Sequence, residues 1–192
     1  MIDFDSMQTR IDHLFLLLNS KGNEAYHSEP VSQLEHALQS AYYAKYHTDK
    51  PNIILAALLH DIGHLIEDET EDLLGHYDHD RIGAAYLRDL GFGPDITRLV
   101  DNHVRAKRYL VTTDFDYKNK LSAASKLTLI QQGGPMRVDE VESFESDPDF
   151  DDIILIRICD ELAKTPGLPV PLLESYSPMI KQYLMDVNKI EN

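Results

Sequence analysis

A run of seven apolar residues, Ile53 to Leu59, leads without a break into His60 and Asp61. A run of this kind belongs in a protein core, so the two polar side chains that follow it are expected to be buried with it. Burying a polar group without a partner costs roughly 2–7 kcal/mol. The sequence therefore predicts a partner for His60 and Asp61, and one metal ion would serve both. A lone histidine–aspartate doublet also occurs by chance, so the prediction depends on the apolar run.

Elsewhere in the chain, apolar residues recur at intervals of three and four, the period of an amphipathic helix. Ile11, Leu14, Phe15 and Leu18 are one example. We find no convincing two-residue alternation of the strand type. We therefore expect an all-α fold, a helical bundle in which residues 1–192 form a single domain.

Local signals set the expected bounds of the helices. Ser32 and Glu35 have the spacing of a capping box, and Pro51 suits the first turn of a helix. We expect residues 112–120 (TTDFDYKNK) to be irregular and the acidic stretch 67–72 to be exposed. Helices are expected before residue 21, at about 32–46, 51–60, 80–91 and 94 to beyond 103, and at about 122–131, 150–163 and 175–189.

The composition argues against several classes of protein. The chain has 33 Asp and Glu against 18 Lys and Arg, and its net charge of −15 would repel nucleic acids and acidic membranes. The single cysteine, Cys159, excludes an intramolecular disulfide framework and a Cys-rich zinc site. No apolar stretch approaches the roughly 20 residues that span a bilayer, and the N-terminal residues do not resemble a signal peptide. We expect a cytoplasmic protein that binds neither nucleic acid nor membrane.

Other histidines and aspartates are candidates to join His60 and Asp61 around a metal. Imidazole and carboxylate ligands without a thiolate suit iron, manganese, zinc or a similar divalent ion. A carboxylate can also bridge two ions, which an imidazole does not normally do. These further candidates are His36, His64, His79, His103 and Asp160. The remaining histidines, which we expect to be ordinary surface or core residues, are His13, His27, His47 and His76.

The order of His36, the His60–Asp61 doublet and Asp160 resembles the H…HD…D signature of the HD-domain superfamily of metal-dependent phosphohydrolases. His79 and His103 extend it to the version that holds two metals. Longer segments are more specific, and they resemble one branch, the mixed-valent diiron oxygenases that cleave phosphonates. These segments, which lie within about residues 20–165, are QLEHALQ, LAALLHDIGH, GAAYLRDLGF, HVRAKRYLV, LSAAS, QQGGPM and IRICDE.

The resemblance implies two iron ions in a mixed Fe(II)/Fe(III) state, with dioxygen as co-substrate. The implied ligands are His36, His60, Asp61 and Asp160 for one iron, and His79, His103 and the bridging Asp61 for the other. Six protein ligands leave open positions on the metals, and a chelating substrate and dioxygen require such positions.

The resemblance also implies the surroundings of the substrate. Lys107, one helical turn after His103, would offer its ammonium to a phosphonate oxygen. Arg157 would do the same or orient the ligand Asp160. Further positions that match the substrate pocket of the family are His64, Gln33 and Ser125.

Tyr26 and Glu29 match a pair that the family uses as a mobile lid at the metal. The tyrosine would occupy an open iron position until substrate displaces it. The glutamate would face the cationic amine of the substrate. The lid would thus both protect the metal and select the substrate.

The activity implied is oxidative cleavage of the carbon–phosphorus bond of a 1-hydroxyphosphonate, a reaction of organophosphonate catabolism. 2-Amino-1-hydroxyethylphosphonate would give glycine and phosphate, and its N-trimethyl analogue would give glycine betaine and phosphate. The residues leave this choice open. They also leave two other classes open: a metal-dependent phosphohydrolase acting on a nucleotide or phosphate ester, and a non-catalytic binding module with a closed metal site.

Overall fold

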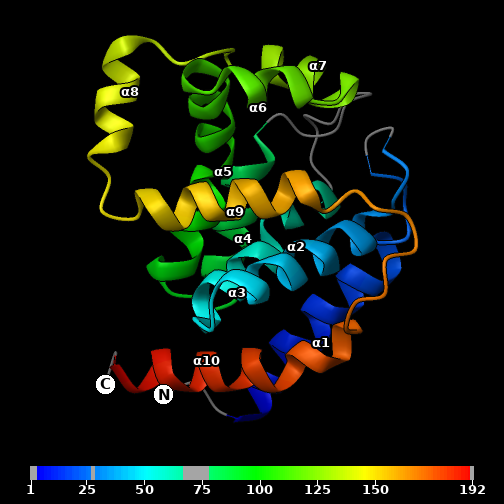
Figure 1. Ribbon diagram of the computed structural model, residues 1–192. Helices are drawn as coiled ribbons and strands as arrows, with labels where there is room; N and C mark the ends of the chain where they lie inside the picture. The colour runs from blue at the N-terminus through cyan, green and yellow to red at the C-terminus, as the bar shows by residue number, and fades with distance from the viewer. Residues whose placement is uncertain (1–3, 27–28, 67–77, 191–192) are drawn as a thin grey trace.

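The computed structural model describes residues 4–26, 29–66 and 78–190, and these residues form ten α-helices and two short 3-10 helices (Figure 1). The expected all-α fold is confirmed. The acidic stretch 67–72, His27 and His76 lie outside the described residues. In chain order the elements are α1 (Phe4–Lys21), α2 (Gln33–His47), α3 (Pro51–Leu59), η1 (Ile62–Leu65), α4 (His79–Asp89), α5 (Pro94–Thr113), α6 (Phe115–Lys120), α7 (Ala123–Gln131), α8 (Val138–Glu145), α9 (Phe150–Leu162), η2 (Leu173–Tyr176) and α10 (Ser177–Ile190).

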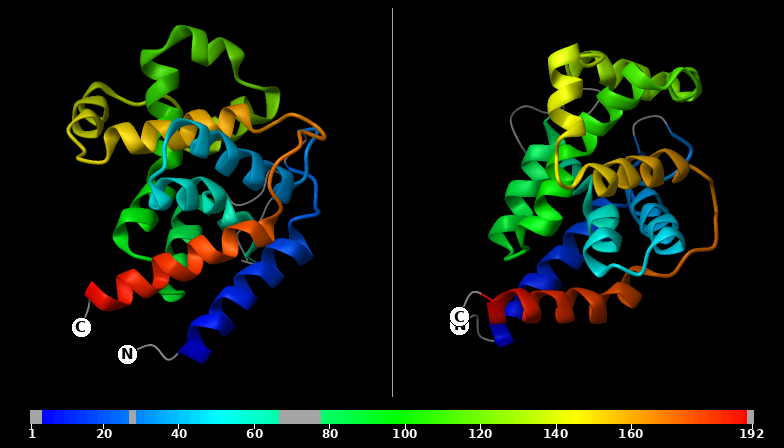
Figure 2. Two further views of the ribbon diagram at one scale, coloured as in Figure 1. Left: turned by 60° about the horizontal axis from the view of Figure 1, so that its bottom comes forward. Right: turned by 60° about the vertical axis from the view of Figure 1, so that its left-hand side comes forward.

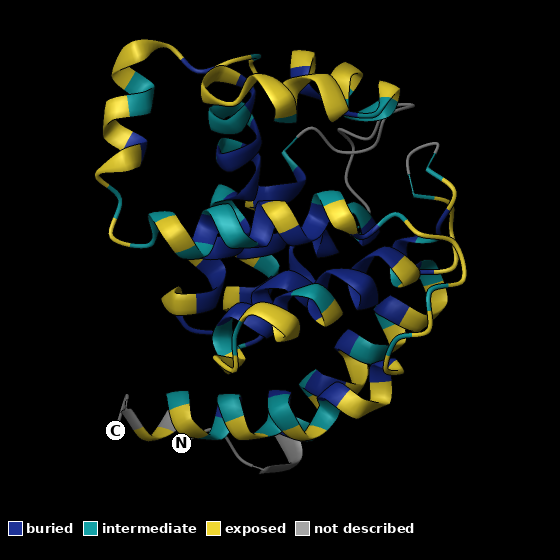
Figure 3. Cartoon of the chain, in the orientation of Figure 1, coloured by how far each residue is buried: buried dark blue, intermediate teal, exposed yellow. Residues whose placement is uncertain are grey.

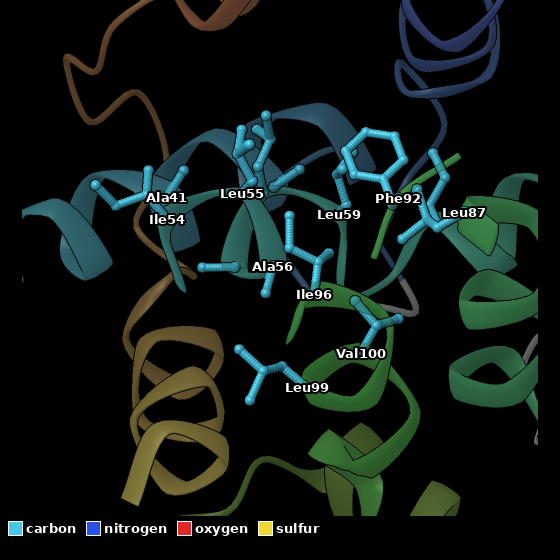
Figure 4. Packing of buried hydrophobic residues seen from close by; sticks show 14 of the residues in the cluster. Ala41, Ile54, Leu55, Ala56, Leu59, Leu87, Phe92, Ile96, Leu99 and Val100 are labelled. Carbon is cyan, nitrogen blue, oxygen red and sulfur yellow. The ribbon is translucent and has the colours of Figure 1, made fainter. Parts of the chain in front are cut away.

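The apolar helix α3 lies at the centre of the bundle. All seven residues from Ile53 to Leu59 are buried, because α3 packs against α2, α5, α9 and α10 on different sides. Figure 4 shows Leu55 and Leu59 of α3 among core residues that include Ile96 and Leu99 of α5. A helix that is surrounded in this way has no polar face, which explains its uniformly apolar sequence.

Other helices cover this core at its two ends. α1 and α10 pack against each other at one end, and α6 and α7 lie at the opposite end, beyond the last turns of α5 (Figures 1 and 2). Burial is concentrated in α2, α3, α5 and α9, whereas α8 and α7 are largely exposed (Figure 3). Within the described residues, no helix is both long and apolar enough to cross a membrane.

Most of the expected helix boundaries are confirmed. Ser32 and Glu35 form the capping box at the start of α2, with backbone-to-side-chain hydrogen bonds of 3.1 and 2.8 Å. Pro51 occupies the first turn of α3. At the end of α4, Gly91 adopts a φ of 90°, a left-handed conformation that glycine tolerates best.

One expected irregular segment is helical. Residues 112–120 contain the last turn of α5 and the whole of α6. The two helices are separated only at Asp114, whose side chain accepts a hydrogen bond of 3.0 Å from the Tyr117 amide and so caps α6. The prediction was wrong because this polar sequence carries its own N-cap. Helix α8 was also not foreseen from the sequence.

Candidate metal centre

The junction between α3 and η1 positions the His60–Asp61 doublet. α3 ends at Leu59 and η1 begins at Ile62, so the two polar residues occupy the turn between them. Both are buried, with exposed fractions of 0% for His60 and 7% for Asp61. Gly63 allows this turn to touch the start of α4, because a Cβ at this position would lie 2.0 Å from the carbonyl oxygen of His79. The close packing brings His79 next to the doublet.

Four imidazoles converge here as two pairs. The Nε2 atoms of His36 from α2 and His60 lie 3.2 Å apart. Those of His79 from α4 and His103 from α5 lie 3.0 Å apart. Four elements that are distant in the sequence therefore direct the same ring nitrogen into one buried volume.

The hydrogen-bond partners of the Nδ1 atoms define the tautomer of three of these imidazoles. The Nδ1 atoms of His36, His60 and His103 lie 2.8, 2.8 and 2.7 Å from main-chain carbonyl oxygens. A carbonyl only accepts, so each Nδ1 carries the hydrogen and the Nε2 of a neutral ring presents a lone pair. When the rings of His36 and His60 are both neutral, their two Nε2 lone pairs face each other, an arrangement that a metal cation stabilises.

Asp61 lies between the two pairs. Its Oδ2 is 3.4 Å from Nε2 of His36 and 3.3 Å from Nε2 of His60. Its Oδ1 is 3.3 Å from Nε2 of both His79 and His103. One carboxylate oxygen thus faces each histidine pair, which is the arrangement that a carboxylate bridging two metal ions requires.

Asp160, from α9, adds a second carboxylate to the pair formed by His36 and His60. Its Oδ1 lies 3.5 Å from Nε2 of His36, and its Oδ2 lies 3.8 Å from Nε2 of His60. Oδ1 of Asp160 and Oδ2 of Asp61 are buried and make no hydrogen bond in the described part of the chain. Buried acceptors of this kind need a cation or a donor.

The electrostatics of the cluster favour a bound cation. Burial alone would lower the pKa of His60, but the carboxylates of Asp61 and Asp160 outweigh it and raise that pKa to about 9. Burial alone would raise the pKa of Asp61, but the charge of His60 and the close imidazoles of His103 and His36 hold that pKa well below its ordinary value. In the metal-free protein, protonated imidazole therefore supplies the positive charge that bound metal ions would otherwise provide.

Two groups of side chains have the donors and spacing to hold a metal ion. The first consists of His36, His60 and Asp160, and the second contains Asp61, His64 and His79. The ring of His64 stacks on that of His79, with centroids 3.9 Å apart. Nitrogen and oxygen donors without a thiolate fit iron, manganese or zinc.

A pocket opens beside the cluster, and its empty space, including the part open to solvent, is about 520 Å³. Besides four of the expected metal ligands, it contacts residues of α5, α7 and α9 and of the segment before α2. Six of the residues expected around the substrate border it, and they are Tyr26, Glu29, His64, Lys107, Ser125 and Arg157. Gln33 lies elsewhere, on a smaller cavity that it shares with the far side of Asp61.

Lys107 lines this cavity and is buried, with an exposed fraction of 4%. Its ammonium donates to Oγ1 of Thr128 at 2.7 Å and to Oε1 of Gln132 at 2.9 Å, both neutral acceptors. Burial, followed by the charge of Arg157, lowers the pKa of Lys107 to about 7. A cation held in this way by neutral groups is suited to bind an anion.

Arg157 contacts a metal-ligand candidate directly. Its guanidinium donates to Oδ2 of Asp160, to Oε2 of Glu161 at 2.5 Å and, from Nε, to the hydroxyl of Tyr117 at 2.6 Å. Of the two roles expected for Arg157, this geometry corresponds to orientation of Asp160.

Tyr26 and Glu29 line the cavity beside the cluster. The Tyr26 ring stacks on the His36 ring, with centroids 3.9 Å apart and an interplanar angle of 13°. Burial, helped by the nearby Asp61, raises the pKa of the Tyr26 phenol well above its ordinary value, so the phenol keeps its proton. The Glu29 carboxylate lies 3.6 Å from the ammonium of Lys164.

Sequence reasoning missed several polar residues at or beside this site. Thr128 and Gln132 line the cavity, and Tyr117, Glu161 and Lys164 contact residues that line it. Thr128 and Gln132 are one helical turn apart and could have been found as a polar pair on the short helix after Ser122. Tyr117 lies in the segment that was expected to be irregular. Glu161 and Lys164 lie one and four residues after Asp160, and only the fold shows that they contact Arg157, Ser125 and Glu29.

Comparison with known proteins gives consistent results. A model of the HD domain matches residues 34–132, which contain every metal-ligand candidate discussed except Asp160. Hydroxymethylphosphonate dioxygenase of Gimesia maris is 40% identical over 179 residues, 91% of this chain and 88% of that protein. The glycine-betaine-forming 1-hydroxy-2-(trimethylamino)ethylphosphonate dioxygenase of Leisingera caerulea is 39% identical over 173 residues, 86% of each chain. An uncharacterised protein of Acanthamoeba polyphaga mimivirus is 38% identical over 180 residues, 92% of this chain and 82% of that protein.

Proposed function

The chain belongs to the HD domain family, and we propose that it is a diiron oxygenase that cleaves the carbon–phosphorus bond of a 1-hydroxyphosphonate. Family membership and the two dioxygenase relatives confirm the expectation of an HD-domain oxygenase. The identity of the metals, the roles of individual residues and the substrate belong to the proposal.

The observation that carries the proposal is the position of the Asp61 carboxylate, which directs one oxygen to each histidine pair beside a cavity with a buried lysine. His36, His60 and Asp160 would hold one iron, His79 and His103 the other, and Asp61 both. The iron pair, when bound, supplies the activation of dioxygen and the oxidation of the carbon that bears the hydroxyl.

The protein's own side chains would bind and orient the substrate. Lys107 would pair with the phosphonate, because its ammonium is buried and has neutral hydrogen-bond partners that an anion can complement. Ser125 and His64, on the same cavity, would contact the substrate. Arg157 would keep Asp160 in place through their ion pair. Tyr26, stacked on His36, would cover the metal position that His36 helps to form until substrate arrives.

The overall reaction balances with one dioxygen for each substrate. A 1-hydroxyphosphonate, R–CH(OH)–PO₃H₂, and O₂ give a carboxylic acid, R–COOH, and H₃PO₄. An aminomethyl group as R gives glycine, a trimethylammoniomethyl group gives glycine betaine, and hydrogen gives formic acid. The substrate is thus a small phosphonate, and R defines the product.

The experiment that tests the proposal measures iron, oxygen and phosphate together. We expect about two irons per chain, and we expect the iron-loaded protein to consume one O₂ for each phosphate released from a 1-hydroxyphosphonate. A phosphohydrolase would release phosphate from a phosphate ester with no oxygen uptake. Release of phosphate from esters alone, or the absence of oxygen uptake with every hydroxyphosphonate tried, would refute the proposal.

A further inference from the structure

Two carboxylates near the cavity, besides the metal-ligand candidates, share one lysine. The Lys164 ammonium lies 3.6 Å from Oε1 of Glu29 and 3.0 Å from Oε1 of Glu161. It also lies 3.4 Å from the hydroxyl of Ser125. The side chains of Lys164, Glu29 and Glu161 are only 14%, 12% and 20% exposed, so they are not a surface ion pair, and Glu29 itself borders the cavity.

The main chain around Lys164 is held in place by α2. The carbonyl oxygen of Ala163 accepts a hydrogen bond of 2.8 Å from Nδ1 of His36. The side-chain amide of Gln39 donates to the carbonyl of Thr165 at 2.8 Å and accepts from its amide at 3.0 Å. Both neighbours of Lys164 are therefore fixed to the helix that supplies a metal-ligand candidate. The main chain of Lys164 is therefore held in a fixed position, from which its side chain extends to Glu29.

The position of Lys164 changes what Glu29 can bind. A carboxylate facing the cavity would attract a cationic amine, which is the role expected for Glu29 from the sequence. Here the Glu29 carboxylate already has a counter-ion within the chain. A substrate ammonium near Glu29 would also lie near the ammonium of Lys164, and like charges at this separation repel strongly in a partly buried site.

On the basis of the proposed function, we infer that Lys164 neutralises Glu29 and selects hydroxyphosphonates in which the group R carries no positive charge. R is then hydrogen or a short alkyl group. Lys164 is a specificity-determining residue in this inference and takes no part in the chemistry.

The test compares two substrates of similar size and shape, 2-amino-1-hydroxyethylphosphonate and the uncharged 1-hydroxypropylphosphonate. For the iron-loaded wild-type protein we expect kcat/KM to favour the uncharged substrate by about tenfold or more, given the repulsion between like charges. Lys164→Gln should move this ratio toward the amine by about tenfold, mainly through KM, because it frees the Glu29 carboxylate. Dissociation constants measured without oxygen should shift in the same direction.

Three further variants distinguish selection by charge from a general loss of structure. Lys164→Arg keeps the charge and should keep the wild-type preference. Lys118→Gln, a change of an exposed lysine on α6, should leave both substrates unaffected. In the double variant Lys164→Gln with Glu29→Gln, the gain for the amine should disappear. Iron content should match the wild type in all of them.

Several outcomes would overturn the inference. A wild-type preference for the amine would show that Lys164 does not exclude a cation. Equal losses for both substrates in Lys164→Gln would show that the lysine contacts the phosphonate that they share. If one substrate is cleaved but the ratio does not move, the inference on Lys164 fails and the proposed function stands. If neither substrate consumes oxygen or releases phosphate, the proposed function fails and the inference fails with it.

Discussion

The Nδ1 atom of His36 donates a hydrogen bond of 2.8 Å to the carbonyl oxygen of Ala163, which lies 127 residues further along the chain. This bond fixes the ring of a metal-ligand candidate on α2 against the end of α9, the helix that carries Asp160. Hydrogen bonds of this kind orient a ligand and set its tautomer before metal arrives. This hydrogen bond thus joins α2 to the end of α9 at the candidate metal centre.

Substitution of Asp61 tests whether it bridges two metals. We expect Asp61→Ala to lose both irons, because one oxygen of Asp61 faces each histidine pair. Asp160→Ala should lose mainly one, because Asp160 lies near only the pair of His36 and His60. Metal analysis of the purified variants gives the iron content per chain, with Asp116→Ala on the exposed surface of α6 as the control. Full occupancy of both positions in Asp61→Ala would exclude the bridging role.

Substitution of Lys107 separates substrate binding from metal binding. We expect Lys107→Ala to weaken hydroxyphosphonate binding by about 1.5–3 kcal/mol, the usual contribution of a hydrogen bond to a charged group. The iron content should stay near the wild-type value, because the partners of Lys107 are Thr128 and Gln132 and not a metal ligand. Calorimetry without oxygen measures the affinity, and Lys126→Ala, an exposed change on α7, is the matched control. An unchanged affinity would mean that Lys107 does not meet the phosphonate.

The parts of the fold that could be predicted from the sequence are those with local causes. The capping box at Ser32 and the proline at Pro51 begin helices through contacts within one turn, and the run from Ile53 to Leu59 is apolar enough to require a central position. Helix α6 was missed although its cause is also local, the cap at Asp114, because most of its residues are polar and none of them is buried. Hydrophobic periodicity cannot detect a helix of that kind.

The candidate site likewise contains some residues that could be predicted from the sequence and others that could not. The metal-ligand candidates could be predicted because imidazoles and carboxylates are rare in apolar surroundings and their order matches a known signature. Tyr117 and Lys164 could not, because each contacts a residue of the cavity only through tertiary packing. Tyr117 contacts Arg157 from a separate helix, and Lys164 is directed by the bonds that hold Ala163 and Thr165. Sequence spacing carries no information on such contacts.

Tyr26 is expected to protect the reduced metal centre. Its ring covers His36, and Tyr26→Phe keeps this stacking but removes the hydroxyl that would occupy an open metal position. We expect the variant to retain iron and to oxidise faster in air than the wild type in the absence of substrate. Saturation with substrate should remove the difference, because substrate then occupies the open metal position in both proteins. The loss of ferrous iron with time measures the rate, and equal rates without substrate would contradict a protective role.

The binding of the phosphonate is expected to depend on pH through Lys107. Burial, followed by the charge of Arg157, lowers the pKa of Lys107 to about 7, so the ammonium loses its proton as the pH rises through that value. A bound anion favours the protonated form, which means that binding above about pH 7 takes up a proton and the affinity falls by up to about tenfold per pH unit.

The variant Lys107→Arg supplies the control for this pH dependence. An arginine stays charged over the whole range, so the decrease that is due to Lys107 should disappear, whereas any contribution from the titration of the phosphonate itself stays in both proteins. Dissociation constants measured without oxygen between pH 6 and about pH 9 would give both curves. If the curves run parallel, Lys107 keeps its proton throughout, and its ammonium is stabilised by more than the neutral oxygens of Thr128 and Gln132.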